Sequence, residues 1–208
     1  MSYVRGTRFL SCIPQDRRTW RGLGRHAWLV AVAITVAWGL LAVPVLPAQN
    51  PKPTEFQVKA AYLYNFGRFI EWPANLMPAK TGSFTICVLG EDPFGPALDA
   101  TLAGEMIGNQ KVVARRISGP PDSGDCRILF ISSTEASRLN KIIESLDKTG
   151  VLTVSDIPLF SQRGGMIQFV LEGNRIRFEV NLTATHRAGL TLSSELLKVA
   201  TTIRRDRD

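Results

Sequence analysis

The chain has 208 residues, with 25 lysine or arginine residues and 18 aspartate or glutamate residues, which gives a formal net charge of +7. Six of the arginines and one aspartate lie before residue 49, so 19 basic and 17 acidic residues remain in the rest of the chain. Because the excess of positive charge belongs mostly to this first segment, the composition does not argue for a nucleic-acid-binding protein.

Residues 1–48 have the parts of an export signal. Basic residues precede an apolar run over 27–43, and Ala48 is a small residue before the expected cleavage point. The run is long for a signal peptide and short for a transmembrane helix, so a retained inner-membrane anchor stays open as the alternative. In both cases the positive flank stays in the cytoplasm, and we expect the remainder of the chain in the periplasm.

A short linker, 49–53, leads into a predicted helix over 54–72. Thr54 and Gln57 have the spacing of a capping box, so the helix begins at Thr54 and ends before Pro73. We expect one stripe of the helix to face the core, formed by Val58, Ala61, Tyr62, Asn65, Phe66 and Phe69. Lys59 and Arg68 are expected in solvent or at the edge of that stripe.

Short apolar segments then alternate with helical segments. Strands are predicted over 83–89, 111–117, 127–131 and 151–154, and helices over 93–103 (capped by Asp92), over 132–148 and from 193 onward, with a short helical turn after 181. This alternation predicts a single three-layer α/β domain over 54–204, with a mostly parallel sheet, helices on both faces and a C-terminal antiparallel hairpin, followed by a solvated tail, 205–208.

Ligands of such sheets bind beyond the carboxyl ends of the strands. That rule points to residues 90–94, 132–134 and 155–160 as the loops where a ligand would lie.

The segment 164–181, GGMIQFVLEGNRIRFEVN, predicts the hairpin. We expect a type II′ turn at Gly173-Asn174, which places Leu171 opposite Ile176, Phe169 opposite Phe178 and Ile167 opposite Val180 on an apolar face against the core. The other face carries a polar row of Arg177, Glu179 and Asn181. This row is either a solvated face of the sheet or the wall of a site for a ligand or partner.

After residue 48 the chain contains two cysteines, Cys87 and Cys126. In an oxidising compartment we expect them to pair, and two buried thiols on neighbouring strands are the alternative. His186 is the lone histidine of the same segment, so no zinc spacing is present, and no nucleophile-elbow pattern occurs. We therefore expect a protein that is not an enzyme and that uses no metal or cofactor.

Six segments, taken in order, resemble the YfiR family of periplasmic proteins. They are residues 55–73, 84–95, 126–132, 151–156, 164–181 and 188–200. The resemblance implies a small α/β domain that often forms homodimers. It also implies a negative regulator that binds the periplasmic sensor domain of an inner-membrane diguanylate cyclase, YfiN, and so lowers cyclic di-GMP and biofilm formation. Cys87 and Cys126 look like the family's disulfide, whereas Ser161 and Gln168 stand in the region of its second cysteine pair.

Two functions from different classes stay open. A protein-binding repressor would use apolar and basic residues near the first helix together with the polar row. A periplasmic small-molecule sensor acting on a different membrane partner would bind a zwitterion or an anion through charge-assisted hydrogen bonds. The candidate residues for ligand or partner binding are Arg68, Arg177, Glu179, Asn181 and Arg187.

Overall fold

The computed structural model of the chain describes residues 52–73 and 82–205. The expected leader (1–48), most of the linker (49–53) and most of the tail (205–208) lie outside the described residues, so these boundaries stay predictions. Within the described ranges, no helix is both long enough and apolar enough to cross a membrane.

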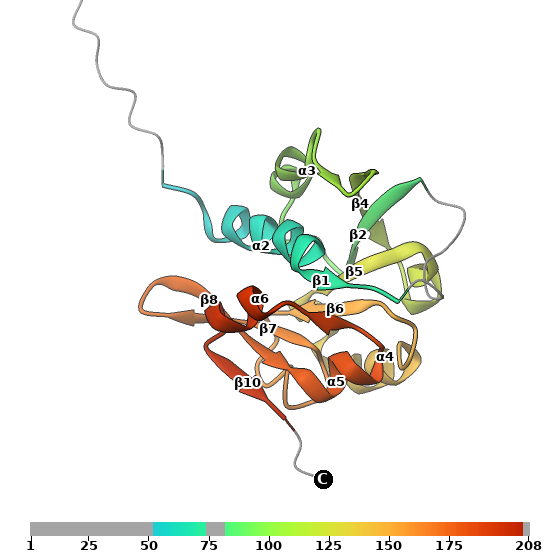
Figure 1. Cartoon of the computed structure of the whole chain (residues 1–208), viewed down its shortest axis with the longest axis vertical. Coiled ribbons are helices and arrows are strands. Elements are labelled where there is room, and N and C mark those ends of the chain that lie inside the picture. Colours follow the sequence, from blue (N-terminus) through green and yellow to red (C-terminus); the bar gives the residue numbers. More distant parts are fainter. Residues whose placement is uncertain (1–51, 74–81, 206–208) are drawn as a thin grey trace, which may run out of the picture. The chain divides into compact units, whose positions relative to one another are not determined.

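An eight-stranded sheet runs through the described residues (Figure 1). In spatial order its strands are β10 (Thr202–Arg204), β8 (Arg175–Asn181), β7 (Ile167–Glu172), β6 (Leu152–Ser155), β5 (Cys126–Ile131), β2 (Ser83–Leu89), β4 (Gln110–Ile117) and β3 (Met106–Ile107). The β7–β8 and β3–β4 pairs are antiparallel, and the other neighbouring pairs are parallel. The predicted fold, a mostly parallel sheet with a C-terminal hairpin, is confirmed.

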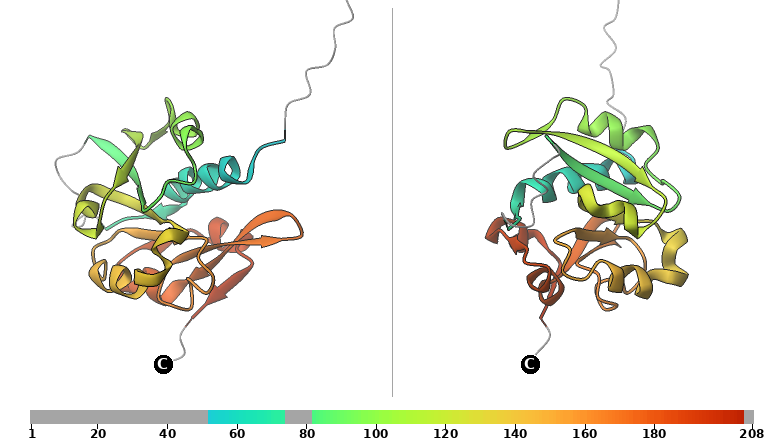
Figure 2. Two further views of the ribbon diagram at one scale, coloured as in Figure 1. Left: turned by 180° about the vertical axis from the view of Figure 1, so that it is seen from behind. Right: turned by 90° about the vertical axis from the view of Figure 1, so that its right-hand side faces the viewer.

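Helices cover both faces of this sheet. They are α2 (Glu55–Phe69), α3 (Pro96–Leu102), α4 (Leu139–Ser145), α5 (Leu182–Arg187) and α6 (Ser194–Val199), with the 3-10 helices η2 (Pro120–Asp125) and η3 (Ser133–Arg138). Two further strands, β1 (Ile70–Glu71) and β9 (Thr191–Leu192), pair antiparallel and join the end of α2 to the segment after α5. Figure 2 shows α2 and α4 on opposite sides of the sheet.

Two apolar cores follow from the alternation of side chains along the central strands. In β2, Ile86 and Val88 pack into the core beneath α2, α3 and α6, whereas Cys87 and Leu89 pack into the core beneath α4. All four side chains are fully buried, as expected for an interior strand that is covered on both faces.

The apolar stripe of α2 differs from the prediction. The capping box at Thr54 is present, but the buried side is formed by Lys59, Ala60, Leu63, Phe66 and Gly67. Of the predicted stripe only Phe66 is fully buried, while Ala61 and Phe69 are exposed. Lys59, which was expected in solvent or at the edge of the stripe, is only 3% exposed, and its ammonium group is paired with Glu55 and Asp156. Arg68 is exposed, as predicted.

The hairpin has the predicted register, with Phe169 opposite Phe178 and Gln168 opposite Glu179. The turn type was wrong. Gly173 and Asn174 both have positive φ, 52° and 64°, which is a type I′ turn and matches the twist of the strands. The apolar face is buried only near the sheet, because the hairpin extends beyond the body of the domain, and Leu171 is 63% exposed (Figure 1).

Two helices begin differently from the prediction. Asp92 does not cap α3: its carboxylate accepts a hydrogen bond from the Phe94 backbone N–H (2.8 Å), and Gly95, with φ of 51°, is the N-cap of a helix that starts at Pro96. The segment predicted as one helix over 132–148 is a 3-10 helix, η3, followed by the shorter α4.

The end of the chain contains a strand where a fading helix was expected. α6 ends at Val199, and β10 then pairs parallel with β8. The Thr201 N–H and hydroxyl both donate to the Phe178 carbonyl (2.9 Å each), which places β10 at the edge of the sheet.

Candidate functional site

Asn181 lies at the end of β8, where its side chain connects two neighbouring segments of the chain. Its side chain is buried, its Oδ1 accepts a hydrogen bond from the Ala184 N–H (3.0 Å), and its Nδ2 donates to the Ser161 carbonyl (2.8 Å). The residue is thus the N-cap of α5 and ties that helix to the loop that contains Ser161.

Glu179 is also held by neighbours. Its carboxylate accepts a hydrogen bond from the Ser161 hydroxyl (2.9 Å) and lies 3.6 Å from Nε of Arg204 on β10. Arg177, two positions earlier on the same face, is half-buried. The polar row is therefore partly covered by β10 and by the Ser161 loop, and its two inner members contribute to packing at this end of the sheet.

The five predicted residues are not brought together. Arg68 lies on α2, which packs through Phe66 on the face of the hairpin that carries Phe169 and Phe178. Arg177 and Glu179 point to the opposite face, because side chains alternate along β8. Arg187 is exposed in the last turn of α5 and lines a separate hollow of about 30 Å³ against α4.

Lys59, for which the sequence predicts a place in solvent or at the edge of the helical stripe, is buried at the carboxyl edge of the sheet. Lys59 Nζ is 2.5 Å from Glu55 Oε1 and 2.7 Å from Asp156 Oδ2. The centroids of the Phe56 and Phe169 rings lie 4.9 and 6.0 Å from the same nitrogen. The Glu55–Lys59 spacing of four residues in a helix was the sequence signal for this contact.

A pocket of about 270 Å³ opens beside Lys59. Ser133 and Asp156, from two of the loops predicted to bind ligands, line it together with the hairpin residues Leu171 and Ile176. The third predicted loop adjoins this edge, since the Glu91 N–H donates to Thr134 Oγ1 (3.2 Å). The loops at the carboxyl ends of the strands do converge, as the topology rule predicts.

The end of the hairpin presents an apolar surface flanked by charges. Leu171 is exposed and Ile176 is half-buried on one face, while Glu172 and Arg175 are exposed on the other. Figures 1 and 2 show this end extending past the start of α2. We name Leu171, Ile176 and Glu55 the hairpin surface, which borders the Lys59 pocket.

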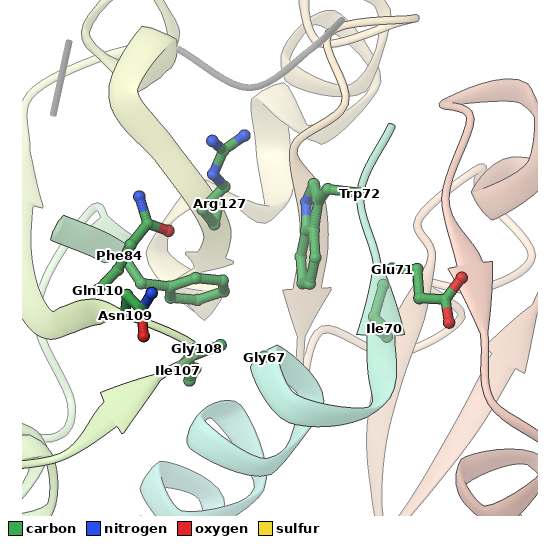
Figure 3. Close-up of a pocket in the computed structure, with 10 residues that line it drawn as sticks. All are labelled: Gly67, Ile70, Glu71, Trp72, Phe84, Ile107, Gly108, Asn109, Gln110 and Arg127. Atoms are coloured by element: carbon green, nitrogen blue, oxygen red, sulfur yellow. The ribbon is translucent and has the colours of Figure 1, made fainter. Parts of the chain in front are cut away.

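A second pocket, of about 420 Å³, lies between the end of α2 and the beginning of β5 (Figure 3). Trp72, Phe84 and Ile107 form its apolar wall. A Cβ at Gly67 would lie too close to Ile107 Cδ1, so a larger residue there would have to displace the Ile107 side chain. Arg127 lines the same pocket and is 4% exposed, and burial lowers the pKa of its guanidinium. Composition patterns gave no signal for this pocket.

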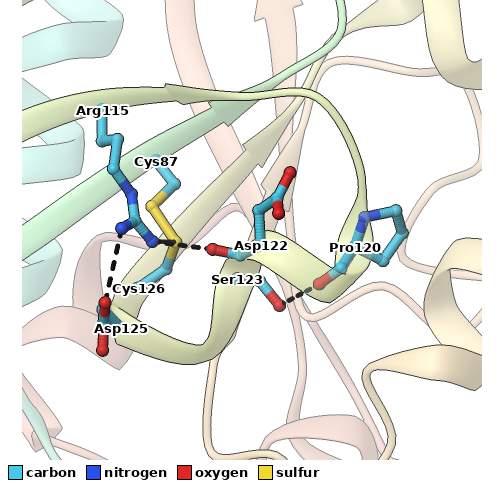
Figure 4. The surroundings of a disulfide bond; sticks show 7 residues. All are labelled: Cys87, Arg115, Pro120, Asp122, Ser123, Asp125 and Cys126. Carbon is cyan, nitrogen blue, oxygen red and sulfur yellow. Dashed lines mark hydrogen bonds and ion pairs between the residues drawn. A yellow bond between two sulfur atoms is a disulfide. The ribbon is translucent and has the colours of Figure 1, made fainter.

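Cys87 and Cys126 form a disulfide, which confirms the predicted pair (Figure 4). The bond joins the adjacent strands β2 and β5, with the two Cα atoms 5.8 Å apart. Arg115 lies over it and donates to the Asp122 carbonyl (2.7 Å) and to Cys126 Sγ (3.6 Å). Both cysteines are buried, so this cross-link belongs to the core of the domain.

Residues 52–73 and 82–205 contain no group of three or more histidine, cysteine, aspartate or glutamate side chains that could hold a metal ion. The described residues do form several pockets, among them the two above, and an apolar surface at the hairpin end.

Two solved structures resemble this chain distantly. One is a conserved domain protein from Vibrio cholerae O1 biovar El Tor, with 12% sequence identity and a TM-score of 0.48, covering 73% of this chain and 60% of that chain. The other is an ABC domain in complex with L-Trp from Streptococcus pneumonia, with 11% identity and a TM-score of 0.43, covering 58% and 55%. The chain thus spans less than two thirds of the length of either structure.

The family comparison covers a similar share of the chain. A model described as YfiR/HmsC-like matches residues 56–201, from the first turn of α2 to the residue before β10. This chain therefore belongs to the YfiR/HmsC-like family.

Proposed function

We propose that this chain is a periplasmic negative regulator that binds the periplasmic sensor domain of an inner-membrane diguanylate cyclase. Binding holds the cyclase inactive and so lowers cyclic di-GMP and biofilm formation. The observation that carries the proposal is the family match over residues 56–201, since the YfiR/HmsC-like family fits the role of a periplasmic, non-catalytic regulator. The buried disulfide is consistent with export to an oxidising compartment.

The proposed contact with the cyclase is the hairpin surface. An exposed leucine beside a half-buried isoleucine leaves apolar surface in contact with water, which is unfavourable in free energy. A partner that covers both side chains removes this contact with water. Glu55 within this surface and the Glu172 and Arg175 side chains beside it supply the polar rim that protein interfaces have. The wider candidates Arg68, Arg177 and Arg187 remain proposed partner contacts. The protein acts as a homodimer in this proposal, and light scattering on the purified full chain measures that state.

Gene deletion followed by complementation tests the regulator proposal. Deletion should raise cyclic di-GMP and biofilm, and the wild-type gene should restore both. Leu171→Asp should fail to restore them, because it places a carboxylate in the proposed contact. Val199→Asp is the matched control, since Val199 is also an exposed aliphatic residue (54%) but lies on α6.

Export and abundance of both variants are checked by immunoblotting of periplasmic fractions. Unchanged cyclic di-GMP after deletion, together with the absence of a membrane cyclase among co-purifying proteins, would refute the regulator proposal. Equal rescue by the two variants would refute the assignment of the hairpin surface.

A further inference from the structure

The indole nitrogen of Trp72 is the starting observation. Trp72 Nε1 is buried and has no hydrogen-bond partner among the residues that the structure describes. A buried donor without a partner costs about 1–3 kcal/mol, and most such groups in proteins are paired. Because Trp72 lines the pocket of about 420 Å³, an acceptor bound there would remove this cost.

The second observation is a buried cation beside that donor. In Figure 3 the Arg127 guanidinium and the indole nitrogen lie toward the same end of the pocket, and the ring of Phe84 lies below them. Arg127 also interacts within the chain. A guanidinium has five N–H donors in a planar fork, so it can serve the protein and a ligand together. The lowered pKa of Arg127 has the same physical origin, since burial removes water from the charge.

The other residues that line the pocket indicate what the part of a ligand beyond its acceptor group should look like. Phe84, Ile107 and the face of Trp72 are apolar, and the Gln110 amide adds a polar group at the rim. Glu71 is exposed and, in Figure 3, lies on the far side of Trp72 from Arg127, so its carboxylate does not share the Arg127 end. The volume is in the range typical of sites for small organic molecules.

We propose that this pocket binds a small organic carboxylate with an aromatic or similarly flat apolar body. The carboxylate accepts hydrogen bonds from Arg127 and from Trp72 Nε1, and the body packs between Phe84 and Ile107. Charge-assisted hydrogen bonds to a guanidinium are the strong ones in proteins, so the acid group supplies selectivity while the body supplies burial. The site does not depend on which membrane protein the chain regulates.

Calorimetry with phenylacetate as the probe tests this site. Phenylacetamide, which has the same body without the charge, is the matched ligand control, and it should bind at least about tenfold more weakly. To locate the binding, the full chain carries Trp20→Phe, Trp28→Phe and Trp38→Phe, so that Trp72 is the one tryptophan left in the sequence. The Trp72 emission should then change with the same saturation curve as the heat.

Two variants of the pocket complete the test. Arg127→Gln should weaken phenylacetate binding about tenfold or more and leave phenylacetamide binding nearly unchanged, whereas Arg205→Gln, which removes an exposed arginine after β10, should leave both unchanged. If Arg127→Gln does not fold, Ile107→Phe is the variant that tests the site, because the larger ring fills the pocket and should abolish phenylacetate binding. The proposal is overturned if phenylacetate gives no saturable signal, if the two probes bind equally, or if the folded variants bind phenylacetate like the wild type.

Discussion

Lys59 and Asp156, which are 97 residues apart in the sequence, meet at the carboxyl edge of the sheet with Nζ and Oδ2 2.7 Å apart. The contact joins the first turns of α2 to the loop that follows β6. Lys59 is buried while Asp156 keeps about a quarter of its side chain exposed, so the lysine depends on its partners more than the aspartate does. This pair therefore fixes the wall of the pocket beside the hairpin surface.

Asp156→Asn should destabilise the folded state by about 1–3 kcal/mol, because it leaves the buried ammonium of Lys59 with Glu55 as its remaining carboxylate partner. Lys59→Met should cost less, since the apolar stem is kept and both carboxylates can recover water. Urea unfolding of the purified protein measures both free energies.

The double variant, Lys59→Met with Asp156→Asn, should be more stable than Asp156→Asn alone. The reason is that it removes the buried Lys59 ammonium, which the single change leaves without Asp156 as a partner. Lys141→Met removes an exposed lysine on α4 and serves as the control for the loss of one positive charge. Equal stability of Asp156→Asn and the wild type would contradict this account of the pair.

The Cys87–Cys126 disulfide should contribute about 4 kcal/mol to the free energy of unfolding. The two cysteines are 39 residues apart, and closing a loop of that length removes conformational entropy from the unfolded chain. Cys87→Ala combined with Cys126→Ala should therefore lower the urea midpoint, and a reducing agent should lower that of the wild type but not that of the double variant. Mass spectrometry of the non-reduced protein checks the bond itself, and free thiols in periplasmic protein would contradict it.

Asp99 should make part of the stability depend on pH. The hydrogen bond from Arg116 lowers the pKa of Asp99 in the folded protein, with burial acting in the opposite direction. A folded-state pKa below that of the unfolded chain gives stability that is present above about pH 4 and is lost as the pH falls through the folded-state pKa. Since the Asp99 side chain is 55% exposed, we expect a contribution below about 1 kcal/mol.

Asp99→Asn should flatten this acid limb, and unfolding free energies between pH 3 and pH 7, about the range in which carboxylates titrate, measure it. Arg116→Gln should flatten the limb as well, because it removes the hydrogen bond that Asp99 accepts from Arg116 (2.6 Å). Parallel pH profiles for Asp99→Asn and the wild type would show that the Asp99–Arg116 pair does not contribute to the pH dependence of stability.

Local sequence patterns predicted the hairpin well. Its two strands alternate with a period of two and its loop has two residues, so the position of Gly173 and Asn174 determines every cross-strand pair from Glu172–Arg175 to Ile167–Val180. The capping box at Thr54 is a similarly local signal, because the two hydrogen bonds that define it span three residues.

Contacts between distant segments were not predictable in the same way. The buried face of α2 differs from the expected stripe because it depends on tertiary contacts such as that of Lys59 with Asp156, and helical spacing carries no information about a residue 97 positions away. β10 was missed for the same reason, since three residues next to a charged tail become a strand through pairing with β8. Tertiary contacts override weak local propensity at such positions.

The candidate site has one part that the sequence predicted and one part that it did not. The loops after β5 and β6 meet beside the hairpin, as topology requires of parallel strands. The basic candidates Arg68 and Arg187 lie apart from Glu179, because their helices pack on different parts of the sheet and residue chemistry alone does not specify a face. The pocket beside Trp72 is formed by α2, β2, β3 and β5 together, so it exists only in the folded chain.

The turn at the end of the hairpin gives a last prediction. Asn174 has φ of 64°, a left-handed conformation that asparagine tolerates and alanine does not adopt without strain. Asn174→Ala should therefore destabilise the protein by about 1 kcal/mol, whereas Asn174→Gly should be neutral or slightly stabilising, because glycine suits both central positions of a type I′ turn. Thermal unfolding of the two variants distinguishes them, and equal melting temperatures would argue against the positive φ at this residue.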